Sequence, residues 1–209
     1  MVSVDRSRIG EVCQLLAEAL KDDPLSIYFF PDETTREENL TKMFLPEIGY
    51  CFRHGLVYGE IYGDEMAGVA VWLTPESKPR TTFMLIGNGG LGLLFKLPIR
   101  TLYRMARYDR FSAEIHRKIA PFPHWYLHVI AVMESYRGKG IASRLLRPVF
   151  AELDRKGLPC YLETQNPANV ALYEHFGFQV KDESEIPGTG STRNWAMLRM
   201  PISGLGNSY

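Results

Sequence analysis

Two glycines and two basic side chains directly follow an apolar stretch, in the segment Arg137-Gly138-Lys139-Gly140-Ile141-Ala142-Ser143. If the apolar stretch is a strand and the residues after the glycines begin a helix, several backbone N–H groups converge at the helix N-terminus. Those groups and the helix dipole favour a bound phosphate or pyrophosphate, and the small residues let the backbone approach it closely. The segment therefore predicts an anion site. The alternative is an ordinary strand-to-helix turn with exposed basic residues.

Two titratable side chains lie inside apolar runs. His128 follows Tyr126 by two residues, so both side chains point to one face of a strand. The unperturbed pKa of histidine is near 6.5, so its imidazole can accept or release a proton near neutral pH. Glu163 lies in the run 160–164, and a carboxylate in a buried strand requires a partner. We interpret His128 as a candidate for proton transfer, with a structural histidine as the alternative, and Glu163 as its rival.

No metal or redox site is predicted. The cysteines Cys13, Cys51 and Cys160 are far apart and form no Cys-x-x-Cys pair. His116 and His124 show no metal-ligand spacing with other His, Cys or acidic residues. We expect Cys160 to be a small core residue rather than a nucleophile, because free cysteine in a strand usually packs as an apolar side chain.

One glycine pattern resembles a dinucleotide-binding turn without its context. The segment Gly87-Asn88-Gly89-Gly90-Leu91-Gly92 fits Gly-x-Gly-x-x-Gly, with Asp109 near the offset of a ribose-binding acid. The apolar stretch before it is short, Pro98 interrupts the helix that would follow, and no second strand carries the acid. Nicotinamide binding is therefore not expected.

Composition limits the class of protein. The chain has 209 residues, of which 45% are hydrophobic and 23% charged, and these values fit a single globular domain over 1–209. Lys and Arg number 24, equal to Asp and Glu, so no global field attracts a polyanion, and a general nucleic-acid binder is not expected.

The chain also lacks patterns typical of export or of a membrane span. The stretch Phe83–Leu97 is shorter than the roughly 20 residues that a span requires. The residues Met1–Arg6 include an acid in place of a basic and then apolar leader. We expect a cytoplasmic protein without membrane association, and the cysteine usage fits a reducing compartment.

Helical periodicity predicts the N-terminal elements. Residues 8–21 form an amphipathic helix with Ser7 as a possible cap, and a second helix with Thr34 or Thr35 as its cap runs to about Cys51. Pro46 is expected to bend or interrupt that helix. A β-hairpin follows over 56–73. Two or three helices are expected within 82–120, as an insertion that walls a pocket.

The C-terminal half alternates strands and helices. The expected strands are 125–132, 160–164, 178–186 and 193–200, and the expected helices run from the glycine turn to about Lys156 and over 167–175. The first of these strands is nearly continuously apolar, so we expect it to be buried on both faces. This order predicts an α/β (mixed α+β) fold, with helices packed against a mixed sheet.

Two motifs carry a resemblance to a known family. Val132 with Arg137-Gly138-Lys139-Gly140-Ile141-Ala142 resembles the Arg/Gln-x-x-Gly-x-Gly/Ala motif of the GCN5-related N-acetyltransferases (GNAT). The segment 166–178, which contains Leu172-Tyr173 and Gly177-Phe178, is similar to the second signature of that family. The two motifs occur in the family's order and at its separation.

The resemblance implies a fold, a co-substrate and a reaction. The fold would be a twisted, mostly antiparallel sheet of six to seven strands flanked by helices. The reaction would move the acetyl group of acetyl-CoA to an amine by direct attack in a ternary complex, without a metal. The residues that would hold acetyl-CoA are Ile130, Ala131, Val132, Arg137, Gly138, Lys139, Gly140, Ile141, Ala142, Ser143, Asn166, Asn169 and Tyr173.

The resemblance also assigns catalytic roles. Tyr173 matches the family tyrosine that protonates the departing CoA thiolate, with a packed core aromatic as the alternative. The segment 127–132 resembles the strand of arylalkylamine acetyltransferases that carries two histidines, so His128 is a base or proton relay. The first of that pair is Tyr126 here. Glu163 is the rival base, or an anchor for the substrate ammonium.

The acceptor is expected to be a primary amine of a small molecule. The segments 69–77, 162–164, 185–187 and 193–197 resemble the puromycin N-acetyltransferase branch of the family. Tyr28, Phe30, Trp72 and Tyr126 are candidates to line the acceptor pocket, with core packing as the alternative. Two other functions remain open: a non-catalytic acetyl-CoA-binding regulatory module, and a protein N-acetyltransferase. The expected assembly is a monomer or homodimer.

Overall fold

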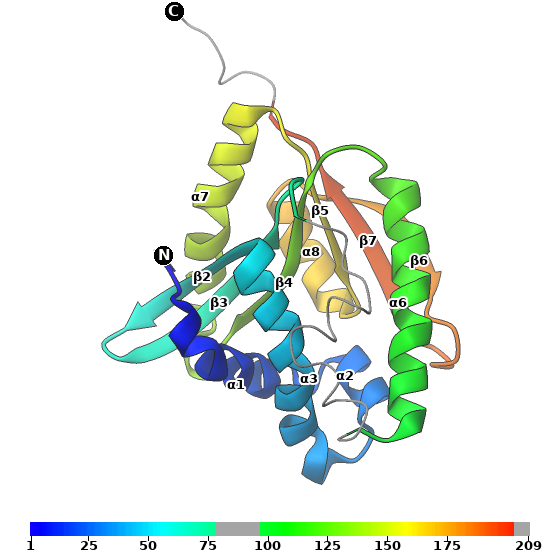
Figure 1. The fold of residues 1–209 in the computed structure, drawn as a ribbon. Helices are drawn as coiled ribbons and strands as arrows, with labels where there is room; N and C mark the ends of the chain where they lie inside the picture. Colours follow the sequence, from blue (N-terminus) through cyan, green and yellow to red (C-terminus); the bar gives the residue numbers. More distant parts are fainter. Residues whose placement is uncertain (78–96, 203–209) are drawn as a thin grey trace, which may run out of the picture.

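The computed structural model describes residues 1–77 and 97–202, and within these ranges the strands form one seven-stranded sheet with the order β1-β2-β3-β4-β5-β7-β6 (Figure 1). The strands are β1 Val2–Ser3, β2 Gly55–Tyr62, β3 Glu65–Leu73, β4 Trp125–Val132, β5 Cys160–Thr164, β6 Gln179–Glu185 and β7 Arg193–Arg199. The helices are η1 Arg6–Arg8, α1 Ile9–Leu20, α2 Pro24–Phe29, α3 Glu33–His54, α6 Ile99–Ile119, η3 Glu134–Tyr136, α7 Ile141–Lys156 and α8 Pro167–His175. The mixed sheet flanked by helices confirms the predicted fold class.

The strands β4 and β5 diverge after a short parallel pairing. Among the described residues they pair only at Trp125 with Cys160 and at Tyr126 with Tyr161, whereas the other neighbours in the sheet are antiparallel. Beyond Tyr126, the edge of β4 that faces β5 is therefore not covered by a strand. This opening in the middle of the sheet is where a ligand could reach backbone groups.

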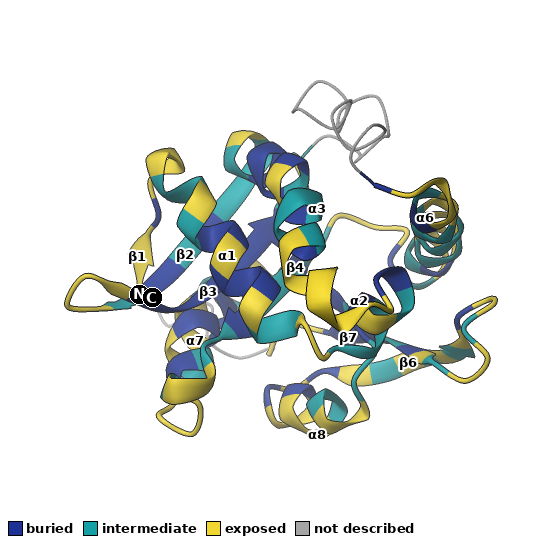
Figure 2. Cartoon of the chain, turned by 90° about the horizontal axis from the view of Figure 1, so that it is seen from below, coloured by how far each residue is buried: buried dark blue, intermediate teal, exposed yellow. Residues whose placement is uncertain are grey.

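The two faces of the sheet carry separate apolar cores. Val69 and Val71 of β3 pack with residues of α1 and α3, whereas Ala70 and Trp72 pack with residues of α7. This alternation follows from the two-residue period of a strand. Figure 2 shows α1 and α3 on one side of the sheet and α7 and α8 on the other.

The N-terminus of α7 lies against the middle of the sheet. A Cβ built on Gly68 of β3 would lie 2.8 Å from Cγ2 of Ile141 and 3.0 Å from the carbonyl oxygen of Ala131. Gly68 therefore permits a close approach that a larger residue would prevent. This contact holds the start of α7 beside the end of β4.

Several predicted boundaries differ from the structure. Asp5 caps η1 by accepting a hydrogen bond from the Ser7 N–H, so Ser7 is not a cap. Asp32, rather than Thr34 or Thr35, caps α3, because its carboxylate accepts the Thr34 N–H at 3.0 Å. The helix α3 continues through Pro46 to His54 without interruption.

Two further predictions concern the middle of the chain. The range 82–120 contributes one described helix, α6, and residues 78–96, which hold the glycine pattern at 87–92, lie outside the described residues. The strand β4 is not fully buried on both faces, because Val129 and Ile130 are only half-buried. Within the described ranges, no helix combines the length and apolarity needed to cross a membrane.

Candidate active site

The glycine turn forms one wall of a cleft at the start of α7. Gly138 and Gly140 adopt φ angles of +74° and +75°, which glycine tolerates and other residues rarely adopt. Gly140 is the N-cap of α7 and makes no side-chain capping hydrogen bond. The N–H groups of the first helical turn, which have no partner inside a helix, therefore remain for a ligand. This geometry fits a pyrophosphate.

The cleft has a volume of about 630 Å³ and runs from this turn along the open edge of β4. It is lined by twelve of the thirteen residues expected to hold acetyl-CoA: Ile130, Ala131, Val132, Arg137, Gly138, Gly140, Ile141, Ala142, Ser143, Asn166, Asn169 and Tyr173. Lys139 is not among the lining residues that the structure describes. Its ammonium lies 4.9 Å from the centre of the ring of Tyr136, which does line the cleft.

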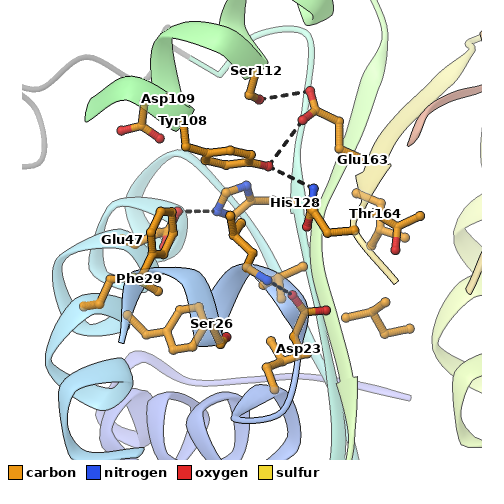
Figure 3. A pocket seen from close by; sticks show the side chains of 18 of the residues that line it. Asp23, Ser26, Phe29, Glu47, Tyr108, Asp109, Ser112, His128, Glu163 and Thr164 are labelled. Atoms are coloured by element: carbon orange, nitrogen blue, oxygen red, sulfur yellow. Dashed lines mark hydrogen bonds and ion pairs between the residues drawn. The ribbon is translucent and has the colours of Figure 1, made fainter. Parts of the chain in front are cut away.

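A second cavity, of about 220 Å³, lies on the α3 side of β4 (Figure 3). Its apolar wall comes mainly from α2, α3 and α6, with Phe29, Met43, Phe44 and Met105 as the principal side chains. Four carboxylates also line it: Asp23, Glu47, Asp109 and Glu163. An acidic cavity of this kind favours a cationic ligand such as an amine.

His128 and Glu47 are hydrogen-bonded to each other in the wall of the second cavity. His128 Nε2 lies 2.9 Å from Glu47 Oε1, and both side chains are largely buried. The register between β3 and β4 shifts at Val71 and Trp72, which leaves His128 as an extra residue in β4. Such a bulge re-aims a side chain. The hydrogen bond to Glu47 fixes the orientation of the imidazole ring in the cavity wall.

Glu163 accepts hydrogen bonds from three hydroxyl groups. The Tyr161 hydroxyl donates at 2.6 Å and the Ser112 hydroxyl at 3.0 Å to Oε1, and the Tyr108 hydroxyl donates at the long distance of 3.4 Å to Oε2. Burial raises the pKa of Glu163, while these hydroxyl groups oppose the rise. All three donors are uncharged hydroxyl groups. Burial raises the pKa of Tyr161, so its hydroxyl keeps its proton.

The two cavities meet at Tyr173. Five residues line both: Leu20, Asp23, Ile130, Asn169 and Tyr173. Burial raises the pKa of the Tyr173 hydroxyl, and the negative charge of Asp23 adds to the rise. The phenol therefore stays protonated at neutral pH and has a proton to donate. Burial likewise raises the pKa of Asp23, whose carboxylate caps α2 by accepting the Leu25 N–H at 2.9 Å.

The residues expected to line the acceptor pocket have different positions. Tyr126 lines the second cavity. Trp72 does not: it is fully buried on the α7 face of the sheet, where it packs against Trp125 and Phe150, so its assignment was wrong. The alternation of β3 decides this, because even-numbered residues of its middle segment face α7.

The aromatic segment at 28–30 is also corrected. Phe29, rather than Phe30, lines the second cavity, and Phe30 is buried in the core beside α1 and α3. Tyr28 is bound by α6: Arg107 donates to its hydroxyl at 2.7 Å, and the Arg104 guanidinium lies 5.3 Å from its ring centre. This contact fastens α6 to α2 over the cavity.

Sequence reasoning missed Glu47 and Asp23. Glu47 lies on the helical stripe Leu40, Phe44 and Cys51, whose other members are buried, so a carboxylate on an apolar stripe was an available signal. The sequence around Asp23 indicates only an N-cap for a helix that begins at Pro24.

His116 and His124 contact one another rather than a cluster of ligands. Their Nε2 atoms lie 2.7 Å apart, and the His116 ring stacks on Tyr161 with centroids 4.2 Å apart. Within residues 1–77 and 97–202, no group of three or more His, Cys, Asp or Glu side chains is arranged to hold a metal ion.

Comparisons with known proteins agree with this architecture. The model of the acetyltransferase (GNAT) family matches residues 90–178. An uncharacterised N-acetyltransferase of Schizosaccharomyces pombe is 29% identical over 171 residues, which cover 78% of this chain and 67% of that protein. The chain therefore spans about two thirds of the length of this relative.

Solved structures have the same fold. A Corynebacterium glutamicum structure described as histone acetyltransferase HPA2 and related acetyltransferase aligns with a TM-score of 0.67 at 21% identity, covering 98% of this chain and 97% of that chain. Arylalkylamine N-acetyltransferase 2 of Aedes aegypti aligns with a TM-score of 0.62 at 14% identity, covering 95% of this chain and 97% of that chain. At these identities the similarity establishes the fold.

Proposed function

We propose that this protein, which the family-model match and the structural neighbours support as a GNAT acetyltransferase, transfers the acetyl group of acetyl-CoA to a primary amine of a small molecule. One observation carries the proposal: a cleft with a glycine turn suited to pyrophosphate and an acidic cavity are adjacent and share Tyr173 as a lining residue. Two reactants bound there would meet without leaving the protein, as direct attack in a ternary complex requires.

The residues of the first cleft fit acetyl-CoA, which supplies an activated acetyl thioester when bound. The N–H groups at the start of α7 and the Arg137 guanidinium would hold the pyrophosphate. The open edge of β4 at 130–132 offers backbone groups along the cleft. Fixed N–H donors of this kind stabilise the negative charge that develops on a carbonyl oxygen.

The second cavity would bind the amine and remove its proton. An amine attacks only in its neutral form, so a base must accept a proton before or during attack. His128, paired with Glu47, is the base that this geometry favours. Glu163 is less suited to that role, because three hydroxyl groups already donate to it.

The size of the cavity, about 220 Å³, favours a small acceptor over a protein. The side chains of α2, α3 and α6 line it, and the contact of Tyr28 with Arg104 and Arg107 joins two of these helices. A protein N-acetyltransferase needs a groove that admits a peptide. The resemblance of segments 69–77, 162–164, 185–187 and 193–197 to the puromycin N-acetyltransferase branch supports the same expectation.

The first experiment measures the thermal midpoint with and without acetyl-CoA. At about 100 times its dissociation constant, a ligand adds roughly 2.7 kcal/mol of stability, which corresponds to a rise of about 5 to 10 °C for a domain of this size. No rise at saturating acetyl-CoA would contradict the proposal. A rise without acetylation of any amine would instead favour a non-catalytic acetyl-CoA-binding module.

Replacing Tyr173 by Phe tests its role as proton donor. The variant retains the ring that packs 5.9 Å from Phe178 and loses the hydroxyl at the junction. We expect kcat to fall on the order of 100-fold, because general acid catalysis contributes at least this much. Acetyl-CoA affinity, measured by calorimetry, should change less than about threefold. Equal losses in kcat and in affinity would assign Tyr173 a packing role.

A further inference from the structure

The amine cavity has more negative charge than acceptance of one proton requires. Glu47 is paired with His128. Asp23 and Glu163 have different surroundings: their hydrogen bonds come from a backbone N–H and from hydroxyl groups. Among the lining residues that the structure describes, none is Lys or Arg. Within the described lining, Asp23 and Glu163 therefore face neutral donors, whereas buried carboxylates are normally paired with a cation.

Extra carboxylates would hinder the reaction of a simple monoamine. Each negative charge near the reacting nitrogen raises the pKa of the amine and so lowers the fraction that is neutral. A carboxylate away from the reacting nitrogen, paired with a second cation of the same substrate, avoids this effect. The position of Glu163 meets that condition: it lines the amine cavity but not the acetyl-CoA cleft, whereas Asp23 lines both.

The space between the two carboxylates suits an alkyl chain. Figure 3 shows Glu163 and Asp23 at opposite ends of the view, with His128 between them. Phe29, Met43 and Met105 line the same cavity, and thioether side chains adapt to a flexible ligand. The hydroxyl groups of Tyr161 and Ser112 fix one oxygen of Glu163, so the carboxylate is oriented before the ligand arrives.

We infer that the acceptor is a small dicationic amine, in which one nitrogen reacts at the junction beside Tyr173 while the second, as an ammonium, binds Glu163. This inference rests on the proposed function, because it identifies the substrate class of the same cavity. The shorter bonds, from Tyr161 and Ser112, go to Oε1 of Glu163, and the long bond from Tyr108 goes to Oε2. That oxygen is the ammonium acceptor.

The test compares linear diamines of three to five carbons with the alkylamines of equal length. We expect kcat/KM to be about 10- to 100-fold higher for the best diamine than for its matched alkylamine, as is typical when a buried charge gains a partner. In Glu163→Gln this preference should collapse to within about threefold. Glu183→Gln, a carboxylate on the exposed side of β6, is the matched control and should retain the preference.

Binding without acetyl-CoA separates this inference from the proposed function. Calorimetric titration with diamine and alkylamine should show the same preference and the same loss in Glu163→Gln. Acetylation of both amine types with equal kcat/KM, or equal loss for both in Glu163→Gln, would overturn the inference and leave the function standing. Binding of the diamine through Glu163 with no acetylation would overturn the function and leave the cavity's ligand class standing.

Discussion

Replacing His128 by Ala should lower kcat for amine acetylation by about 100- to 10,000-fold while acetyl-CoA binding stays within about threefold. His128 is the imidazole in the wall of the amine cavity, and its hydrogen bond with Glu47, at 2.9 Å, holds the ring in place. Loss of the imidazole leaves the amine without a base beside the junction. Steady-state kinetics and calorimetry on the same preparation measure both quantities.

Added imidazole distinguishes a base from a packing residue. It should restore part of the rate of His128→Ala, because the truncated side chain leaves room for the free base. The control is His175→Ala, an exposed histidine at the end of α8, whose rate should not change. A His128→Ala rate close to that of the parent, or a loss that imidazole does not relieve, would move the role of base to Glu163 or Glu47.

Replacing Gly138 by Val should remove most of the stabilisation that acetyl-CoA gives, about 2.7 kcal/mol at 100 times the dissociation constant. A side chain here has no protein atom within 4 Å of its Cβ, so it extends into open space at the pyrophosphate turn. The φ of +74° also strains a β-branched residue and shifts the N–H groups that the turn presents.

The β2–β3 hairpin supplies a matched control for that strain. Gly63 has a φ of +60° and likewise no atom within 4 Å of a built Cβ, but it lies in the hairpin turn. Gly63→Val should lose a similar amount of intrinsic stability, about 1 to 3 kcal/mol, and should keep the rise in thermal midpoint with acetyl-CoA. If both variants keep the full rise, the glycine turn does not hold the pyrophosphate.

The elements that bind through backbone groups were predictable because their signals are local. The strand at 125–132, the glycine turn and the helix to Lys156 lie next to one another in the chain, and a helix N-terminus presents its N–H groups whatever the distant contacts are. The helix at 167–175 was predicted for the same reason, since Asn166 caps it and Pro167 opens it.

The amine cavity depends on contacts between distant segments. Glu47 and His128 are 81 residues apart, and Ser112 and Glu163 are 51 apart. No periodic pattern in the sequence relates residues so far apart, because tertiary packing rather than local helix propensity brings these helices together. The signal at Glu47, a carboxylate on an apolar stripe, marks an unusual residue without naming its partner.

The sequence by itself determined the order of strands and α-helices from β4 to β7, the glycine turn and the positions of His128, Glu163 and Tyr173. Only the tertiary structure decided on which face of the sheet each side chain packs. Trp72 lies in a strand that is apolar on both faces, so alternation alone did not identify its side, and packing against α7 placed it in the core. The acidic cavity exists because α2, α3 and α6 close over the strand pair where β4 and β5 separate, and that separation is a property of the whole sheet.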